Sequence, residues 1–293
     1  MQLTLPARSP FSFMSVVNSH GWLQLAPFEF DEVASVLHYT DRLASGHVLE
    51  YRVSGDSQGV QVTATGRLNK AEQREVADKV AWMFGLDMDF SGFYAASRGE
   101  PKLAKARRLA HGRVLRSPTL FEDVIKTILT TNTLWSATKR MTGNLIRQYG
   151  AALDGGSEKR AFPGPASIAA GTPDVLRDTV RVGYRASAIH DLARRVASGE
   201  YDLEALKTST LPTLELRQEL MKIKGVGPYA AANLLLILGR SDFIPIDSWA
   251  LKLVSHEWYG GQPVAAREVE KAFESWGQYK GLAYWFWDWK YKG

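Results

Sequence analysis

The sequence predicts a small α+β domain, an antiparallel sheet with helices, followed by a mainly α-helical body. Two segments in the first hundred residues, HVLEYRV (47–53) and VQVTATG (60–66), alternate apolar and polar positions as half-buried strands do. From about residue 100 onward the apolar residues recur at helical spacing instead. We therefore expect one domain over residues 1–100 and a second over residues 101–293.

In the first domain, the turn cluster SGDSQG (54–59) lies between the two strand segments and predicts a hairpin. A helix is expected next, because Asn69 and Glu72 have the spacing of a capping box. The apolar residues Val76, Val80 and Phe84 fall on one face of this helix. Gly85 is expected to end it.

In the helical body, single residues mark the helix ends. Pro118 indicates the start of one amphipathic helix and Gly150 the end of the next, and the pair Thr172-Pro173 opens another. Further helices are expected over residues 183–199, 213–223 and 267–293, the last of them rich in Trp. Most of the nine Trp residues are expected to lie in the core.

The composition excludes several classes of protein. Hydrophobic residues make up 45% and charged residues 23% of the 293 positions, a balance typical of a globular protein. No apolar run has the length needed to span a bilayer and the N-terminus lacks a signal-peptide pattern, so we expect a cytoplasmic, bacterial-type protein. With no Cys, disulfides, thiolate catalysis and Cys-ligated iron–sulfur clusters are ruled out, and the scattered His residues argue against a catalytic metal.

The basic charge is mild overall but concentrated in one place. The 36 Lys and Arg residues exceed the 31 acidic residues enough to give a net charge of +5. Residues 101–117 (PKLAKARRLAHGRVLRS) contain six Lys or Arg and no acid. Such a run suits contact with phosphates, although a solvated helix face is the commoner explanation of a charge run.

A short stretch near residue 225 carries the most specific pattern. Gly225, Val226 and Gly227 form a turn between two apolar helical segments, and a helix beginning at Pro228 would direct its free N–H groups outward beside bare backbone. Twenty residues further on, Asp247 is a lone carboxylate in the apolar, strand-like segment FIPID. Asp247 is either an N-cap for the helix SWALKLV or a catalytic group, and one residue can do both.

Taken whole, LMKIKGVGPYAAANLLLILGRSDFIPIDSWA resembles the helix–hairpin–helix motif, with the Gly/Pro-rich loop and aspartate, of the HhH-GPD DNA glycosylase superfamily. The resemblance places the motif at about 213–238 and the aspartate loop at 239–248. It implies that the hairpin (Gly225, Val226, Gly227, Tyr229) grips the DNA backbone. It also implies that Asp247 is the catalytic carboxylate of a base-excision repair enzyme acting on a flipped base.

Order and spacing along the whole chain are similar to the branch containing 8-oxoguanine glycosylase and bacterial 3-methyladenine glycosylase II. In LFEDVIKTILTTNTLWSATKRM the resemblance makes Asn132 the residue that fills the gap left by the flipped nucleotide. In VGYRASAIHDLARRV it makes Tyr184 a wedge against the opposite strand and Arg185 a contact to the orphaned base. A loop residue, a core residue and a surface charge, respectively, are the plainer explanations of these three positions.

Departures from the family pattern indicate the subclass. Family members that also nick the strand carry a Lys just inside the helix after the hairpin, where this chain has Tyr229, and a phenol cannot form the required imine. Lys222 and Lys224 lie on the hairpin itself. We therefore expect a monofunctional hydrolase that leaves an abasic site. The lack of Cys excludes the branches that carry an iron–sulfur cluster.

The resemblance also provides a base pocket, made by Tyr229, Asn233, Tyr284, Trp287 and Asp288. Tyr284 and Asp288 stand where the oxoguanine enzyme has residues that recognise its base. Ala137 replaces an opposite-base Arg. An aromatic pocket suits electron-poor alkylated purines such as 3-methyladenine. An 8-oxoguanine-type glycosylase with lyase activity and a non-catalytic DNA-binding module remain the alternatives.

No cofactor is expected to be required. The family implies a structural Na⁺ or K⁺ held by the backbone carbonyls of Met221, Ile223 and Val226. The expected partner is double-stranded DNA containing a damaged base, with no membrane association, and a monomer acting at the bacterial nucleoid is the simplest assembly.

Overall fold

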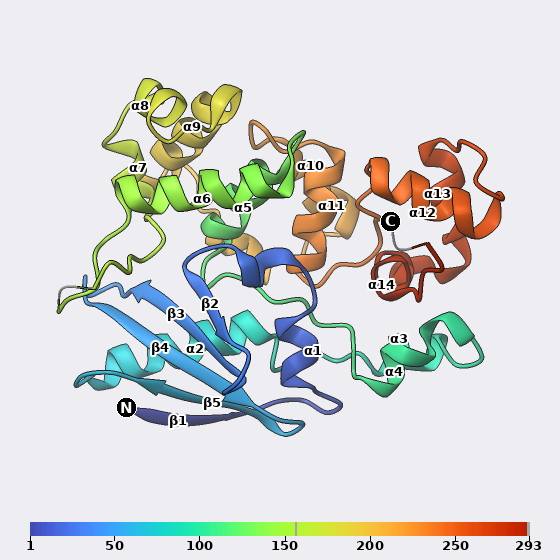
Figure 1. Cartoon of the computed structure of the whole chain (residues 1–293), viewed down its shortest axis with the longest axis horizontal. Helices are drawn as coiled ribbons and strands as arrows, with labels where there is room; N and C mark the ends of the chain where they lie inside the picture. The colour runs from blue at the N-terminus through green and yellow to red at the C-terminus, as the bar shows by residue number, and fades with distance from the viewer. Residues whose placement is uncertain (156, 292–293) are drawn as a thin grey trace. The chain divides into compact units, whose positions relative to one another are not determined.

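The computed structural model describes residues 1–155 and 157–291. Two compact units are formed from segments interleaved along the chain (Figure 1). Unit 1 comprises Met1–Asp87, Arg113–Thr208 and Ile223–Gly225, and unit 2 comprises Met88–Gly112, Ser209–Lys222 and the chain from Val226 onward. The boundary predicted near residue 100 marks a change from strand-like to helix-like spacing of apolar residues, whereas these units group residues that contact one another in space. Each unit contains chain from both sides of residue 100.

Unit 1 contains a five-stranded antiparallel sheet in the order β1-β5-β4-β3-β2. Its strands are β1 (Gln2–Pro6), β2 (Phe28–Asp31), β3 (Val36–Arg42), β4 (Val48–Gly55) and β5 (Gly59–Ala64). The two strands and the hairpin expected from the sequence are β4, β5 and their turn. The α+β class of the N-terminal region is confirmed.

One face of the sheet packs on helices. Tyr39 and Tyr51 pair across β3 and β4, so they share a face, and their rings stack with centroids 5.6 Å apart. The Tyr51 hydroxyl contacts Met83 of α2 (Lys70–Phe84), and the Tyr39 hydroxyl donates to Glu122 of α5 (Leu120–Thr130). This face therefore meets both helices.

Helix α2 begins and ends as the sequence predicts. Asn69 and Glu72 form a reciprocal capping box, and Gly85 ends the helix in the left-handed conformation. The predicted apolar face, Val76, Val80 and Phe84, is buried. Local sequence signals were sufficient here.

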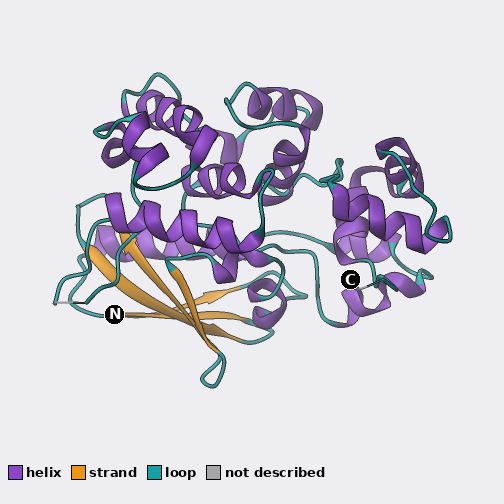
Figure 2. Ribbon diagram, turned by 45° about the horizontal axis from the view of Figure 1, so that its top comes forward, coloured by secondary structure: helices purple, strands orange, loops and turns teal. Residues whose placement is uncertain are grey.

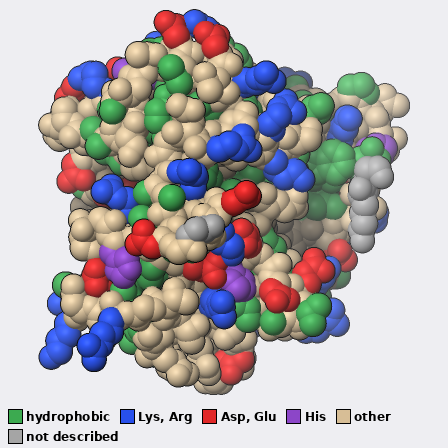
Figure 3. Space-filling model, turned by 60° about the vertical axis from the view of Figure 1, so that its left-hand side comes forward, with side chains coloured by type: hydrophobic (Ala, Val, Ile, Leu, Met, Phe, Trp, Pro, Cys, Tyr) green, Lys and Arg blue, Asp and Glu red, His purple; other side chains and the backbone are tan. Residues whose placement is uncertain are grey.

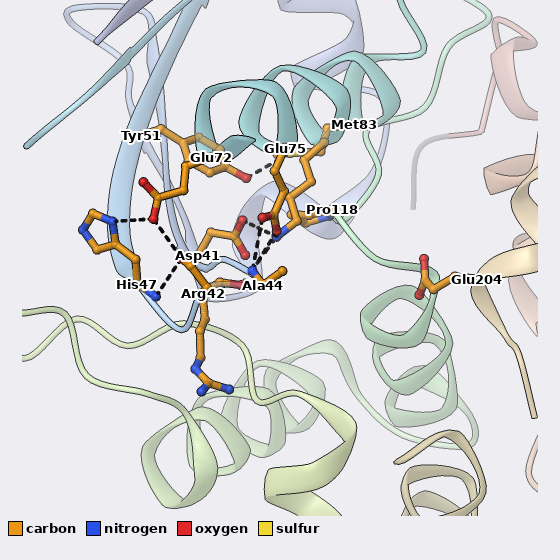
Figure 4. A network of polar contacts seen from close by, with 12 residues as sticks. Asp41, Arg42, Ala44, His47, Tyr51, Glu72, Glu75, Met83, Pro118 and Glu204 are labelled. Atoms are coloured by element: carbon orange, nitrogen blue, oxygen red, sulfur yellow. Dashed lines mark hydrogen bonds and ion pairs between the residues drawn. The ribbon is translucent and has the colours of Figure 1, made fainter. Parts of the chain in front are cut away.

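Polar contacts attach the β3–β4 turn to α2 (Figure 4). Lys79 lies 2.8 Å from Asp41 and 2.9 Å from Glu75, while Glu75 accepts the Ala44 N–H and Glu72 accepts the Ser45 hydroxyl. Burial raises the pKa of Asp41 to about 6, although Lys79 acts in the opposite direction. The turn is thereby fixed to the helix by charged hydrogen bonds.

Unit 1 has further helices, and three of their boundaries match the predicted signals. These helices are α1 (Phe13–Val17), α5, α6 (Trp135–Tyr149), α7 (Pro165–Ala169), α8 (Pro173–Asp178) and α9 (Ala186–Ala197), with 3₁₀ turns at Gly21–Gln24, Gly183–Arg185 and Glu204–Thr208. Thr119 caps α5 just after Pro118, Gly150 follows α6, and Thr172 caps α8. The Glu204 carboxylate also accepts the N–H groups of Leu120 and Phe121 at the start of α5.

The first turns of α5 carry buried charged groups. Lys126 is fully buried, 2.6 Å from Glu122 and 4.5 Å from the centroid of the Phe28 ring. Asp123 is also fully buried and accepts hydrogen bonds from Trp22 Nε1 (2.7 Å) and the Ser117 N–H (2.9 Å). Burial raises the pKa of Asp123 to about 7, and the two hydrogen bonds only partly oppose this rise.

Unit 2 is helical (Figure 2), and its buried core is rich in aromatic residues. Its helices are α3 (Ser91–Ala96), α4 (Ala104–Arg108), α10 (Thr213–Met221), α11 (Pro228–Ile237), α12 (Ser248–Trp258), α13 (Ala266–Ala272) and α14 (Lys280–Phe286), with 3₁₀ turns at Pro101–Leu103 and Glu274–Tyr279. Phe273 is fully buried and its ring packs edge-to-face with those of Trp258, Tyr284 and Trp287.

The C-terminal segment expected to be helical over 267–293 is helical over much of its described part, but in separate pieces. The chain breaks between α13 and α14, where Gly277 has φ 53° and ψ −122°. Helix α14 then ends at Phe286, so Trp287 is its C-cap and Asp288 lies beyond it. Few residues other than Gly adopt the backbone conformation seen at position 277, which explains the interruption.

Most charges of the basic run 101–117 serve the fold. Arg113 and Arg116 are buried, and Arg113 donates to three backbone carbonyls while Arg116 lies over the Trp82 ring. Lys102 pairs with Glu257 at 2.6 Å, and Arg107 donates to carbonyls of the preceding loop. Lys105 and Arg108 remain exposed. On the face shown in Figure 3, basic and acidic side chains are interspersed, in keeping with the mild net charge.

Among the described residues, no helix is both long and apolar enough to cross a bilayer.

Candidate functional site

The glycine hairpin joins α10 to α11, and its two glycines differ in what they require. Gly225 has φ +90°, which disfavours any other residue. Gly227 is the N-cap of α11 at φ −93°, and a Cβ there would meet nothing within 4 Å. Neither conformation nor packing therefore demands glycine at 227. Its absent side chain leaves the N–H groups at the start of α11 open to an approaching anion.

Three hairpin residues have carbonyls that suit a cation. Met221 is the last residue of α10, and Ile223 and Val226 have buried side chains. Among the described residues, no hydrogen bond is found to the carbonyl oxygens of these three. Unused backbone oxygens of this kind fit a hard alkali cation, so the predicted ligand set is chemically suitable.

Asp247 lies at the start of α12. Its Oδ1 accepts hydrogen bonds from the N–H groups of Trp249 (3.0 Å) and Ala250 (2.8 Å), and the residue is exposed. It is thus the N-cap expected from the sequence. Both hydrogen bonds use Oδ1, so among the described residues Oδ2 remains available to a substrate or a water.

The loop before Asp247 is irregular, and the strand-like interpretation of FIPID was wrong. The loop lies against α14 instead. The Gly281 N–H donates to the Ser241 carbonyl at 2.7 Å, and a Cβ on Gly281 would lie 2.6 Å from the Phe243 carbonyl. Gly281 thus permits the close approach that leads the chain to Asp247. The sequence pattern did not single it out.

Tyr284 of the predicted pocket interacts electrostatically with both Asp247 and Tyr229. Tyr284 is 7% exposed, and burial, followed by the charges of Asp247 and Tyr229, raises its pKa. Tyr229 follows Pro228 at the start of α11, and its carbonyl accepts a hydrogen bond from Asn233 Nδ2 one turn later. The structure therefore brings one acid and two phenols together within unit 2.

The last two predicted pocket residues lie elsewhere in unit 2. Trp287 packs in the aromatic core, and its Nε1 is buried without a hydrogen-bond partner among the described residues. Asp288 is exposed, and its backbone exchanges hydrogen bonds with Lys102. Both residues were expected on the last helix, but they lie after the end of α14. Their contact with a base stays a prediction.

Trp249 is an exposed aromatic residue that the sequence analysis missed. It follows Asp247 by two positions and is 41% exposed. Its ring lies 5.5 Å from that of Tyr291, which stacks on His256 at 4.2 Å. The sequence clue to Trp249 was its position in the first turn of a helix capped by Asp247. An exposed Trp so near a carboxylate is available to a planar ligand.

In unit 1, Asn132 and Leu134 of the turn between α5 and α6, together with Tyr184 of the turn Gly183–Arg185, form an exposed tip. Asn132 adopts the left-handed conformation, and its Nδ2 donates to the Tyr184 hydroxyl at 3.4 Å. Tyr184 is 68% exposed, so the core interpretation of this residue was wrong. Leu134, the residue just before α6, is 77% exposed and was missed, because an isolated Leu before a helix has no distinguishing pattern.

Arg185 is not the surface charge considered as its plainer explanation. It is 7% exposed, and its guanidinium donates to backbone carbonyls at the end of α5. The structure thus joins Asn132, Tyr184 and Arg185 in one cluster. Their contacts with DNA stay predictions.

A glycine hairpin followed by a helix-capping aspartate defines a protein of the helix–hairpin–helix class. Residues 125–278 match the model of the HhH-GPD superfamily of base excision DNA repair proteins. The chain belongs to this superfamily, and the resemblance inferred from the sequence is confirmed.

Curated relatives and solved structures agree with this assignment. The chain is 28% identical to the DNA-3-methyladenine glycosylase of Bacillus subtilis over 183 residues, 61% of this chain and 60% of that protein. It therefore spans about three fifths of that relative's length. A 3-methyladenine DNA-glycosylase from Archaeoglobus fulgidus shares the fold with TM-score 0.75 at 20% identity, over 97% of both chains. A Clostridium acetobutylicum 8-oxoguanine glycosylase/lyase, solved with double-stranded DNA, gives TM-score 0.72 at 21% identity, over 98% of this chain and 95% of that one.

Proposed function

We propose that this chain is a monofunctional DNA N-glycosylase that hydrolyses the bond between deoxyribose and a flipped, damaged base, leaving an abasic site. The observation that carries the proposal is Asp247, an exposed carboxylate whose Oδ1 is fixed by two backbone N–H groups. The family membership and the two tyrosines near this carboxylate support the same conclusion.

The geometry of Asp247 suits the reaction. As the base leaves, positive charge of oxocarbenium type develops on the sugar. A carboxylate held in place before the reaction stabilises that charge without reorganising. Two N–H groups hold Oδ1, while Oδ2 is available to face the sugar or orient the attacking water.

Water is the proposed nucleophile because no amine stands at the required position. Tyr229 occupies the start of α11, and a phenol forms no Schiff base. Lys222 pairs with Glu219 on the hairpin, and Lys224 is exposed there. Abasic-site formation without strand cleavage follows.

Two surfaces are proposed to hold the DNA. The bare backbone at Gly227 and the N–H groups of α11 bind phosphate, with a Na⁺ or K⁺ at the carbonyls of Met221, Ile223 and Val226 adding positive charge. No other cofactor is required. The exposed tip formed by Asn132, Leu134 and Tyr184 enters the duplex where the damaged nucleotide leaves it.

Alkylated purines such as 3-methyladenine are the proposed substrates. Tyr229 and Tyr284 provide aromatic faces, and an electron-poor, positively charged base gains from such faces. The hydroxyl of Tyr284 is protonated at neutral pH, as an ordinary phenol is, so it can donate a hydrogen bond. The B. subtilis and A. fulgidus relatives are 3-methyladenine glycosylases, which supports the same substrate class. The enzyme is proposed to act as a monomer on double-stranded DNA in the cytoplasm.

The test is base release from duplexes carrying 3-methyladenine, other alkylated purines, 8-oxoguanine, hypoxanthine or uracil. Products are resolved with and without alkali, which cleaves abasic sites. The proposal expects release of alkylated purines, with strand breaks after alkali alone. Breaks without alkali, together with a borohydride-trapped adduct, would establish a lyase instead. DNA binding without release of any base would indicate a non-catalytic module.

A further inference from the structure

The exposed tip of unit 1 follows the C-terminal end of α5. The last carbonyls of a helix lack partners within the helix and must find others or face water. In α5 these carbonyls are satisfied by side chains. The hydroxyls of Thr130, Thr131 and Thr138 donate to the carbonyls of Thr127, Ile128 and Leu129 at 2.7, 2.8 and 3.0 Å. The end of α5 is therefore held unusually well for a segment that leads into an exposed turn.

Arg185 adds a charged group to this end. Its Nε donates to the Ile128 carbonyl at 3.2 Å, its Nη1 to the Val182 carbonyl at 3.3 Å, and its Nη2 to the Thr131 carbonyl. A guanidinium beside a helix C-terminus also interacts favourably with the helix dipole. All three nitrogens thus donate to backbone within unit 1.

The same guanidinium supports Tyr184. Its carbon lies 4.5 Å from the centroid of the Tyr184 ring, a cation–π contact that holds an otherwise 68% exposed ring in place. The hydrogen bond from Asn132, hydrogen bonding with Thr131 and the charge of Arg185 together lower the pKa of the Tyr184 hydroxyl. Thr131, Asn132 and Tyr184 are thereby linked through one buried side chain.

We propose that Arg185 is a positioning residue. It holds the tip of Asn132, Leu134 and Tyr184 in the conformation that enters DNA, and it takes no part in choosing the base opposite the lesion. To read a base edge, the guanidinium would have to leave three carbonyls and expose the end of α5. The effect on excision rests on the proposed function, whereas the effect on the tip does not.

The first experiment compares Arg185→Lys with Arg177→Lys, a control on α8 whose exposed side chain pairs with Asp174 and Asp178. Hydrogen exchange of the backbone amides of residues 129–134 is measured in the free proteins. In Arg185→Lys these amides should exchange about tenfold faster, because the variant loses about one charge-assisted hydrogen bond. In Arg177→Lys their exchange rates should be unchanged. Unchanged exchange in Arg185→Lys would overturn the positioning role.

The second experiment measures base release by the same proteins with the lesion opposite each of the four ordinary bases. Arg185→Lys should lower all four rates by one common factor, because the tip is loosened for every duplex. A direct contact to the opposite base would make about a 5- to 150-fold difference between partners. Loss confined to one partner base in Arg185→Lys would therefore overturn the proposal.

A third measurement compares DNA complexes of the unmutated protein, and the variant is used only to assign one resonance. The Arg185 Nε–H resonance, assigned by its absence in Arg185→Lys, is followed in unmutated protein bound to abasic-site duplexes with each opposite base. One chemical shift for all four complexes is expected, and a shift that depends on the partner base would contradict the proposal. If no base is released from any lesion, the proposed function fails, and the exchange and resonance measurements still decide the role of Arg185.

Discussion

Replacing the buried Asp123 by asparagine should remove a pH dependence of stability. The Asp123 side chain is fully buried in unit 1, where Trp22 and Ser117 donate to its Oδ1. Its Oδ2 has no hydrogen-bond partner among the described residues. Asparagine has the shape of the protonated acid and keeps an oxygen for both donors, so Asp123→Asn imitates the neutral form.

The magnitude follows from the pKa of Asp123, which burial raises from 3.8 to about 7 in the folded protein. Below pH 3.8 the acid is protonated in both states, and its contribution to stability is complete. As the pH rises toward 7, the unfolded chain releases the proton while the folded protein keeps it, so stability falls. At 1.36 kcal/mol per pKa unit, the full loss is about 4 kcal/mol, of which about 3 kcal/mol falls between about pH 4 and pH 7.

The assay is urea unfolding of wild type and Asp123→Asn across this pH range. The difference in free energy of unfolding between the two proteins should shift by about 3 kcal/mol in favour of the variant as the pH rises. Asp41, whose pKa is raised to about 6, titrates in both proteins and cancels in the difference. Asp154→Asn, exposed on a loop, serves as the control for removing one acid. A difference that does not change with pH would refute the account of this buried group.

Two further predictions concern the site and the tip. Gly281→Ala places a Cβ 2.6 Å from the Phe243 carbonyl, so it should displace the loop that leads to Asp247. We expect single-turnover base release to fall about tenfold or more, while DNA affinity measured by fluorescence anisotropy is largely kept. An unchanged release rate would show that the loop does not depend on this contact. Leu134→Ala should leave the free energy of unfolding within about 0.5 kcal/mol because the side chain is 77% exposed, yet weaken release from duplexes. Equal release by Leu134→Ala and wild type would remove Leu134 from the tip's function.

The features predicted well from the sequence depend on neighbours along the chain. Asn69 and Glu72 cap α2 through contacts three residues apart, and Asp247 caps α12 in the same way. The glycine hairpin is equally local. Its turn needs a positive φ at Gly225, and its bare backbone needs the missing side chain at Gly227. For such features, residue types and spacing are sufficient.

The features that were missed depend on contacts distant in sequence. Arg113 looks like part of a basic phosphate-binding run, but backbone carbonyls of residues 8, 10 and 85 hold it in the core. Arg185 is similar, since its partners at the end of α5 lie more than fifty residues earlier in the chain. Gly281 was missed because its importance comes from the loop that packs on it. The interleaving of the two units likewise has no local signal.

The most direct test of the proposed function is single-turnover base release by Asp247→Asn beside wild type, with DNA affinity measured in parallel. Asparagine is as good an N-cap as aspartate, so α12 should keep its start and the variant should fold and bind DNA. The account predicts that release of an alkylated purine falls by about 100-fold or more, because the negative charge that stabilises the oxocarbenium-like transition state is lost. Release by Asp247→Asn at close to the wild-type rate would contradict the assignment of Asp247 as the catalytic carboxylate.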